Sequence, residues 1–275
     1  MSKRKRSKDQ HSGPLLWAIG ACAVLAVLTV FLQSSVPGFR MTFFKAIGFQ
    51  SVVTVMFAFW IALALADRRY RPRKSLLVAS VVVYAAVLLV SLAFSIDPGL
   101  SFWSSERRMT GIAFILHCVA WFLMLSSVLR TREEWKPFLG FVSAVATVMA
   151  VVAVIQSAMT GFAKPGISAL GNTSYLAAYL LITIFITAYL LVGSASKTRY
   201  LLGGAMGLQI IAAILTSSRG ALVTLVVCFL VGVIGITLVS KISRGRKALV
   251  IATALLFVLL SVAGFFIIRT PSVKS

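Results

Sequence analysis

Nine long apolar runs divide this 275-residue chain, and short connections that carry most of its charge separate them. The runs cover residues 14–32, 43–66, 75–95, 110–129, 137–159, 173–193, 200–216, 220–240 and 248–268. About 20 apolar residues in a helix cross the ~30 Å hydrocarbon core of a bilayer, so each run predicts a membrane-spanning helix. The runs are continuous rather than alternating, which disfavours a membrane β-barrel. We therefore expect an all-α, polytopic membrane helix bundle of about nine transmembrane helices.

The composition excludes the two main alternatives to a membrane protein. Hydrophobic residues make up 60% of the chain, and the mean hydropathy is +1.00. Too few polar side chains are present to cover a water-facing surface, which excludes a soluble globular domain. The same hydrophobicity excludes a disordered chain.

The positions of the basic residues predict the orientation of the bundle. The chain has 27 lysines and arginines against 6 acidic residues. With the N-terminus in the cytoplasm, 19 of the 27 fall on the inner side and eight on or near the outer side, as the positive-inside rule requires. This orientation defines a basic cytoplasmic tail (1–13), a transmembrane domain (14–268) and an outer C-terminal stub (269–275).

The basic tail predicts contact with anionic lipids of the inner leaflet. It lacks interleaved aromatic residues, so we expect no nucleic-acid partner. The apolar run behind it has 19 residues, longer than the usual core of a signal peptide, so a retained anchor is expected.

Three polar segments are expected on the outer side, each directly before a helix that runs inward. They cover residues 95–111, 164–175 and 216–220. A helix N-terminus exposes unpaired N–H groups and carries partial positive charge, so anions and phosphates settle there. Asn172 or Thr173 is expected to cap one of these helices, and Ser217 or Ser218 another.

Arginines accompany two of these helix starts. Arg107 and Arg108 precede the run that begins near 110, and Arg219 precedes the run that begins near 220. A cation at this position opposes the helix dipole, and a bound anion would explain it. The alternatives are headgroup anchoring of Arg107 and Arg108 with Glu106 as a partner, snorkelling of Arg219, and a purely capping Asn172.

The remaining polar residues of the runs predict packing rather than chemistry. His117 is expected to bond a neighbouring helix or its own backbone, and Gln156 and Gln209 to form hydrogen bonds between helices. The three cysteines fall inside expected spans and show no metal-ligand spacing. We expect neither a metal nor a cofactor.

Three motifs on the outer side resemble the O-antigen ligase and O-antigen polymerase family of bacterial envelope glycan transferases. The first is a Ser-x-Asp segment followed by a Trp and an Arg-x-x-Gly, the second a Gly-Asn-x-x-Tyr-x-Ala-x-Tyr helix start, and the third a Thr-x-Ser-Arg-Gly signature. The matching residues are Ser95, Asp97, Trp103, Arg108, Gly111, Gly171, Asn172, Tyr175, Ala177, Tyr179, Thr216, Ser218, Arg219 and Gly220. The resemblance covers residues 14–268.

The resemblance implies transfer of a glycan from undecaprenyl diphosphate to lipid A-core, a polysaccharide or a protein, at the outer face of the bacterial cytoplasmic membrane. Arg219 and Arg108 would hold the diphosphate, and Arg107, Ser218, Asn172 and Trp103 complete the expected substrate site. The partners are the lipid-linked glycan, its acceptor and membrane lipids.

One departure from the family pattern concerns catalysis. The family carries its presumed catalytic histidine on a large outer loop, whereas this chain stops at Ser275 and places His11 inside and His117 in a span. We therefore expect an N-terminal portion of such an enzyme with no catalytic residue of its own. A transporter or flippase for a lipid-linked or anionic solute is the alternative, and a membrane scaffold is a third reading.

Overall fold

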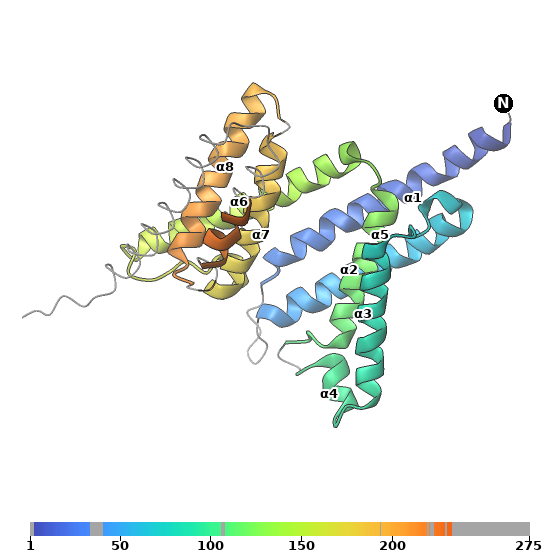
Figure 1. Cartoon of the computed structure of the whole chain (residues 1–275), viewed down its shortest axis with the longest axis horizontal. Coiled ribbons are helices and arrows are strands. Elements are labelled where there is room, and N and C mark those ends of the chain that lie inside the picture. Colours follow the sequence, from blue (N-terminus) through green and yellow to red (C-terminus); the bar gives the residue numbers. More distant parts are fainter. Residues whose placement is uncertain are drawn as a thin grey trace, which may run out of the picture. The chain divides into compact units, whose positions relative to one another are not determined.

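The computed structural model of the chain describes residues 3–33, 41–105, 108–192, 194–218, 220, 223–228 and 230–232. All regular secondary structure in these residues is helical (Figure 1). The elements are α1 (Lys3–Leu28), η1 (Thr29–Phe31), α2 (Met41–Ala66), η2 (Arg68–Tyr70), α3 (Leu76–Ala93), α4 (Pro98–Trp103), α5 (Ile112–Val128), α6 (Arg132–Met159), η3 (Ser168–Leu170), α7 (Thr173–Val192) and α8 (Ser196–Leu215). They belong to the first of two compact units, Met1–Thr216 and Ser217–Ser275.

Among the described residues, six helical segments are long and apolar enough to cross a membrane, which indicates a membrane-embedded helical protein. They are Gly13–Phe31, Thr42–Ala66, Leu76–Ala93, Arg132–Met159, Thr173–Val192 and Lys197–Leu215. Each lies on a run that the sequence predicts as a span, including the glycine-rich run 200–216.

The structure differs from the sequence prediction at three places in the first unit. α1 begins at Lys3, inside the expected tail. The run 110–129 contains the 17-residue helix α5, which is shorter than the other six. The outer segment 95–111 contains a helix of its own, α4, which the sequence analysis missed. Of the last two expected spans, 220–240 is described in part and 248–268 lies outside the described residues.

Helices α1, α2 and α5 share an apolar core. α1 packs along α2, and α2 contacts α5. The buried side chains of this core are Ile19, Cys22, Ala23, Val53, Met56, Leu63, Met124 and Leu125. At one end of the core, Trp60 Nε1 donates to the Ser127 hydroxyl at 2.7 Å and to the Tyr70 carbonyl at 3.1 Å. These bonds join the turn after α2 to the last turn of α5.

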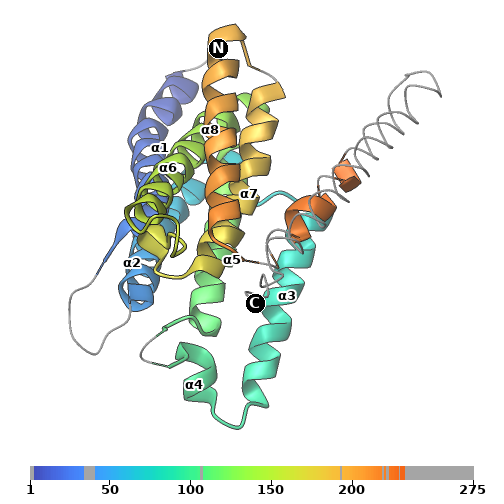
Figure 2. The same ribbon diagram turned by 90° about the vertical axis from the view of Figure 1, so that its left-hand side faces the viewer.

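Helices α6, α7 and α8 form a second packed group, in which α7 and α8 lie side by side (Figure 2). A buried polar network joins all three. Gln209 of α8 donates to the Ser143 carbonyl at 3.2 Å and to the Thr147 hydroxyl at 3.1 Å. The Thr187 hydroxyl of α7 lies 2.7 Å from that of Ser143 and donates to Gln209 Oε1 at 3.3 Å. The expected role of Gln209 between helices is confirmed.

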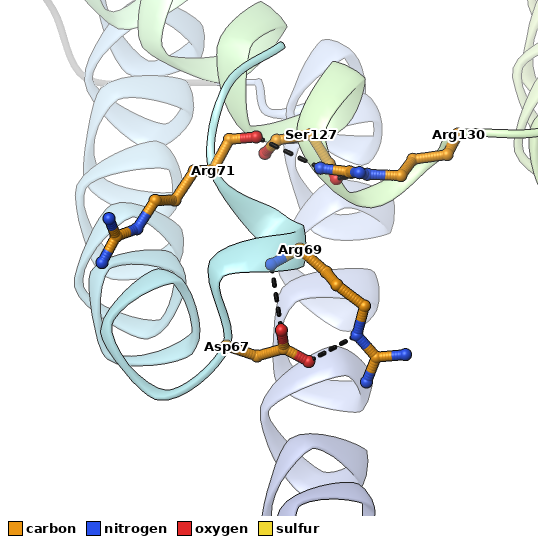
Figure 3. Close-up of polar contacts among 5 residues, drawn as sticks. All are labelled: Asp67, Arg69, Arg71, Ser127 and Arg130. Atoms are coloured by element: carbon orange, nitrogen blue, oxygen red, sulfur yellow. Dashed lines mark hydrogen bonds and ion pairs between the residues drawn. The ribbon is translucent and has the colours of Figure 1, made fainter.

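The connections after α2 and α5 meet at a strongly basic end of the unit (Figure 3). Asp67 accepts bonds from both the backbone N–H and the guanidinium of Arg69, at 2.9 and 2.7 Å. The guanidinium of Arg130 donates to the Ser127 and Arg71 carbonyls, at 2.8 and 3.2 Å. Thr131 and Glu134 then cap α6 reciprocally. The basic connections are therefore held in defined positions by backbone carbonyls and by the Asp67 carboxylate.

Candidate functional site

The first candidate segment, residues 95–111, is built around α4. Asp97 Oδ1 accepts the backbone N–H of Leu100 at 2.9 Å, and Pro98 occupies the first turn of the helix. The hydroxyls of Ser95 and Ser101 lie 2.5 Å apart. Two polar residues of the first motif, Ser95 and Asp97, thus help to hold α4 in place.

Gly111 is the point at which this segment closes on itself. A Cβ atom at Gly111 would overlap the carbonyl oxygen of Phe102, at the end of α4. The residue also serves as the N-cap of α5, with an extended backbone. Only glycine fits this close approach, so the glycine of the first motif has a packing explanation.

Trp103 and Arg108 remain at the surface of this segment. The Trp103 side chain is 51% exposed and packs edge-to-face on Phe102, with ring centroids 4.9 Å apart. The exposed Arg108 makes no side-chain hydrogen bond or ion pair with any described residue. Arg107 lies outside the described residues. Trp103 and Arg108 therefore place an exposed aromatic ring and an exposed cation within one segment.

The second candidate segment, residues 164–175, is fastened to the end of α6. Gln156 Oε1 accepts the backbone N–H groups of Ile167 and Ser168, at 3.0 and 2.8 Å. The backbone N–H of Gly166 donates to the Ser157 hydroxyl at 2.8 Å, and a Cβ atom at Gly166 would overlap the Ala153 carbonyl. Gln156 thus bonds a loop and not, as expected, a neighbouring helix.

Asn172 caps α7. Its Oδ1 accepts the backbone N–H groups of Ser174 at 2.8 Å and Tyr175 at 3.4 Å, which confirms the predicted cap. Gly171, directly before it, has φ 68°, a left-handed conformation that glycine adopts without strain. The amide oxygen of Asn172 is occupied in this way, whereas its NH₂ group remains a donor for a ligand.

Both segments dock on the first turns of α2. Lys45 Nζ donates to the Ala169 carbonyl of the second segment at 2.6 Å. It also donates to the carbonyls of Val30, in η1, and of Leu32, directly after η1, each at 2.8 Å. One turn further along α2, Gln50 Nε2 donates to the Met109 carbonyl of the first segment at 3.3 Å. Residues 95–111 and 164–175 are therefore brought to the same end of the unit.

No motif in the sequence identifies Lys45 or Gln50. The available signal was the position of both polar side chains in the first three turns of an apolar helix, where polar groups need partners.

The third candidate segment, residues 216–220, contains the point along the chain at which the first unit ends and the second begins. Thr216 is buried, and its hydroxyl donates to the Ala213 carbonyl at 2.7 Å. Ser218 is half-buried, and Arg219 lies outside the described residues. The roles of Ser218 and Arg219 therefore stay predictions.

His117 is used inside the bundle. Its Nδ1 lies 2.7 Å from the Ala113 carbonyl and its Nε2 lies 3.1 Å from the Thr54 hydroxyl of α2. This confirms the expected packing role: the ring contacts a backbone carbonyl of its own helix, α5, and a hydroxyl of the neighbouring helix, α2.

No family model, curated protein or solved structure matches this chain. The class to which the fold and composition assign it is that of membrane-embedded helical proteins.

Proposed function

We propose that this chain belongs to the O-antigen ligase and polymerase type of membrane glycan transferases and binds an undecaprenyl diphosphate-linked glycan at its outer end. The observation that carries the proposal is the docking of residues 95–111 and 164–175 on the same turns of α2 through Gln50 and Lys45. Two of the three motifs, separated by more than 50 residues of sequence, thereby share one end of the unit.

The surface chemistry at this end suits a diphosphate. Arg108 provides a planar fork of donors that matches phosphate oxygens. Asn172 adds an amide donor at the start of α7, where the partial positive charge of the helix dipole favours an anion. The Trp103 ring is a surface on which a sugar packs. Arg219, with Ser218 beside it, is the further diphosphate contact in this proposal, and Arg107 is a third cation of the site.

The charge distribution supports the orientation that this function needs. Thirteen lysines and arginines after residue 13 lie in the described part of the chain. Ten belong to the connections at the Trp60 end: Arg68, Arg69, Arg71, Arg73, Lys74, Arg130, Arg132, Lys136, Lys197 and Arg199. Of these thirteen described residues, the other three, Lys45, Arg108 and Lys164, belong to the opposite end. By the positive-inside rule, the first end is cytoplasmic and the proposed glycan site faces outward.

This function assigns the described residues to binding and not to bond breakage. Arginines that hold a diphosphate stabilise the charge that develops on it as the glycan leaves. The proposal places that electrostatic role on Arg108 and Arg219, and names no catalytic base among the described residues.

Photo-crosslinking tests the proposal. The full chain in lipid nanodiscs is irradiated with an undecaprenyl diphosphate glycan that carries a diazirine on its first sugar. We expect labelled peptides from 95–111 and 164–175, and competition by unlabelled undecaprenyl diphosphate. Labelling confined to peptides from 67–75 or 129–136 would contradict it.

A second assay separates this proposal from the transporter alternative. The chain is reconstituted in vesicles with a fluorescent undecaprenyl diphosphate glycan, and a membrane-impermeant quencher reports the leaflet that holds the lipid. The proposal expects binding without movement between leaflets. Protein-dependent movement would favour a flippase.

A further inference from the structure

A cavity of about 380 Å³ lies among α1, α2, α5, α6 and α7. Its walls include Val27, Phe49, Phe114, Trp121, Val142 and Tyr179. It opens to the surface of the helices. Ligand pockets occupy about 300–1,000 Å³, so this open cavity has the size of a binding site.

The chemistry of the walls selects an apolar occupant. The cavity is lined almost wholly by aliphatic and aromatic carbon, and an apolar cavity excludes water and accepts apolar molecules. For helices that cross a bilayer, the hydrocarbon chains of lipids are the apolar molecules in constant contact. A single lipid chain matches both the walls and the surroundings.

Two polar groups in the wall lack partners. Trp121 Nε1 and the Tyr179 hydroxyl are the buried side-chain atoms without a hydrogen-bond partner in the described part of the chain, and both rings line this cavity. Buried donors are normally satisfied, and each exception calls for an explanation. An ester oxygen of a lipid is an acceptor that an all-carbon wall does not offer.

Lys45 gives the cavity a charged rim. Its three N–H groups are directed to the carbonyls of Val30, Leu32 and Ala169, which leaves its positive charge without a carboxylate partner among the described residues. A charge at the edge of the hydrocarbon region is costly unless a counter-charge lies near. An anionic lipid headgroup supplies that counter-charge.

We infer that this cavity holds one acyl chain of an anionic glycerophospholipid whose phosphate lies beside Lys45. The bound lipid is a fixed component of the unit, separate from the glycan-carrying lipid of the proposed function. The inference uses none of the arginines of that function. The two proposals share Lys45, so variants of Arg108 test the glycan site alone and variants of Val142 test the cavity alone.

Lipid retention tests the inference. The full chain is purified in detergent with an equimolar mixture of phosphatidylglycerol and phosphatidylcholine, and bound lipid is counted by native mass spectrometry. We expect one phosphatidylglycerol per chain. Val142→Phe, which fills the cavity, should abolish retention, whereas Val148→Phe, at an exposed site on the same helix, should leave it intact. Equal retention by these two variants would overturn the inference.

The headgroup contact has its own pair of variants. Lys45→Gln removes the charge and should lower the preference for phosphatidylglycerol about tenfold, the effect of ~1.4 kcal/mol, while Lys45→Arg should keep it. An unchanged preference in Lys45→Gln would overturn the charge assignment. Retention of a polyprenyl phosphate in place of a phospholipid would overturn the assignment of the bound molecule as a glycerophospholipid.

Quenching of tryptophan fluorescence tests the inference without a cavity-filling variant. Phosphatidylglycerol brominated along its acyl chain quenches tryptophans that it touches. The inference expects a quenched component that disappears in Trp121→Phe and persists in Trp17→Phe, since Trp17 is 83% exposed. Quenching that Trp121→Phe leaves unchanged would contradict the inference.

Discussion

Lys45 Nζ donates a 2.6 Å hydrogen bond to the carbonyl oxygen of Ala169, a residue 124 positions further along the chain. The same amine bonds the short helix η1, which follows α1, through the carbonyls of Val30 and Leu32. One side chain therefore joins η1, α2 and the segment before α7. The arrangement of the proposed glycan site depends on this junction.

Replacing Lys45 by methionine should loosen residues 164–172. The variant keeps most of the side-chain volume but removes three hydrogen bonds from a charged donor. We expect the free energy of local opening of this segment to fall by about 1–3 kcal/mol. Hydrogen exchange of the backbone N–H groups in 164–172 measures the effect. Lys164→Met, at an exposed position, is the control. Equal protection in the two variants would show that Lys45 does not hold this segment.

Replacing Gly111 by alanine should destabilise the fold. The new Cβ overlaps the Phe102 carbonyl, and overpacking of this kind costs about 1–3 kcal/mol. Gly140→Ala is the matched control, because its Cβ meets nothing within 4 Å in the middle of α6. That variant should be about 0.5–1 kcal/mol more stable. Thermal unfolding followed by circular dichroism in detergent compares the two, and a Gly111→Ala protein as stable as wild type would contradict the packing argument.

Replacing Gln209 by leucine should weaken the contact of α8 with α6 and α7. The substitution leaves Ser143, Thr147 and Thr187 without their shared partner, and single interhelical hydrogen bonds in membranes contribute about 0.6–1.7 kcal/mol. Unfolding of the reconstituted protein by a denaturing detergent measures the loss. Ile211→Leu, on the exposed side of α8, should have no such effect. A neutral Gln209→Leu would mean that apolar packing alone holds these helices.

The two ends of the unit should be accessible from opposite sides of the membrane. Cys22, Cys118 and Cys228 are first replaced by alanine, and a single cysteine is placed at Lys74 or Lys164. A membrane-impermeant maleimide added to intact spheroplasts should label the Lys164→Cys chain and not the Lys74→Cys chain. The reverse pattern would place the basic end outside and refute the proposed orientation.

The helical architecture follows from apolar length alone, because each run has to satisfy its backbone hydrogen bonds internally in lipid. The Asn172 cap and the packing of His117 and Gln209 are also readable from sequence, since a polar group in an apolar run needs a partner nearby. α4 was missed because Pro98–Trp103 is too short to show periodicity. The junction at Lys45 was missed because its partners are backbone carbonyls, which carry no sequence signal.

The sequence also does not reveal which motif residues cap a helix and which bind a ligand. The motif residues Asp97, Gly111 and Asn172 are noticeable in the sequence because they lie in polar segments between apolar runs. In the structure, each of them caps or closes the start of a helix. A capping residue and a ligand-binding residue occupy the same position before a helix, because both answer to the same unpaired N–H groups. Sequence alone therefore cannot separate these two roles.

The affinity of the chain for undecaprenyl diphosphate tests the central proposal most directly. Binding is measured in nanodiscs for wild type, Arg108→Ala and Arg219→Ala, with Arg73→Ala at the basic end as the control. Each site variant should weaken binding about 10–100-fold, as expected for loss of a charge-assisted contact of ~1.5–3 kcal/mol, and the control should bind as wild type does. Equal affinities in all four proteins would contradict a diphosphate site built on these arginines.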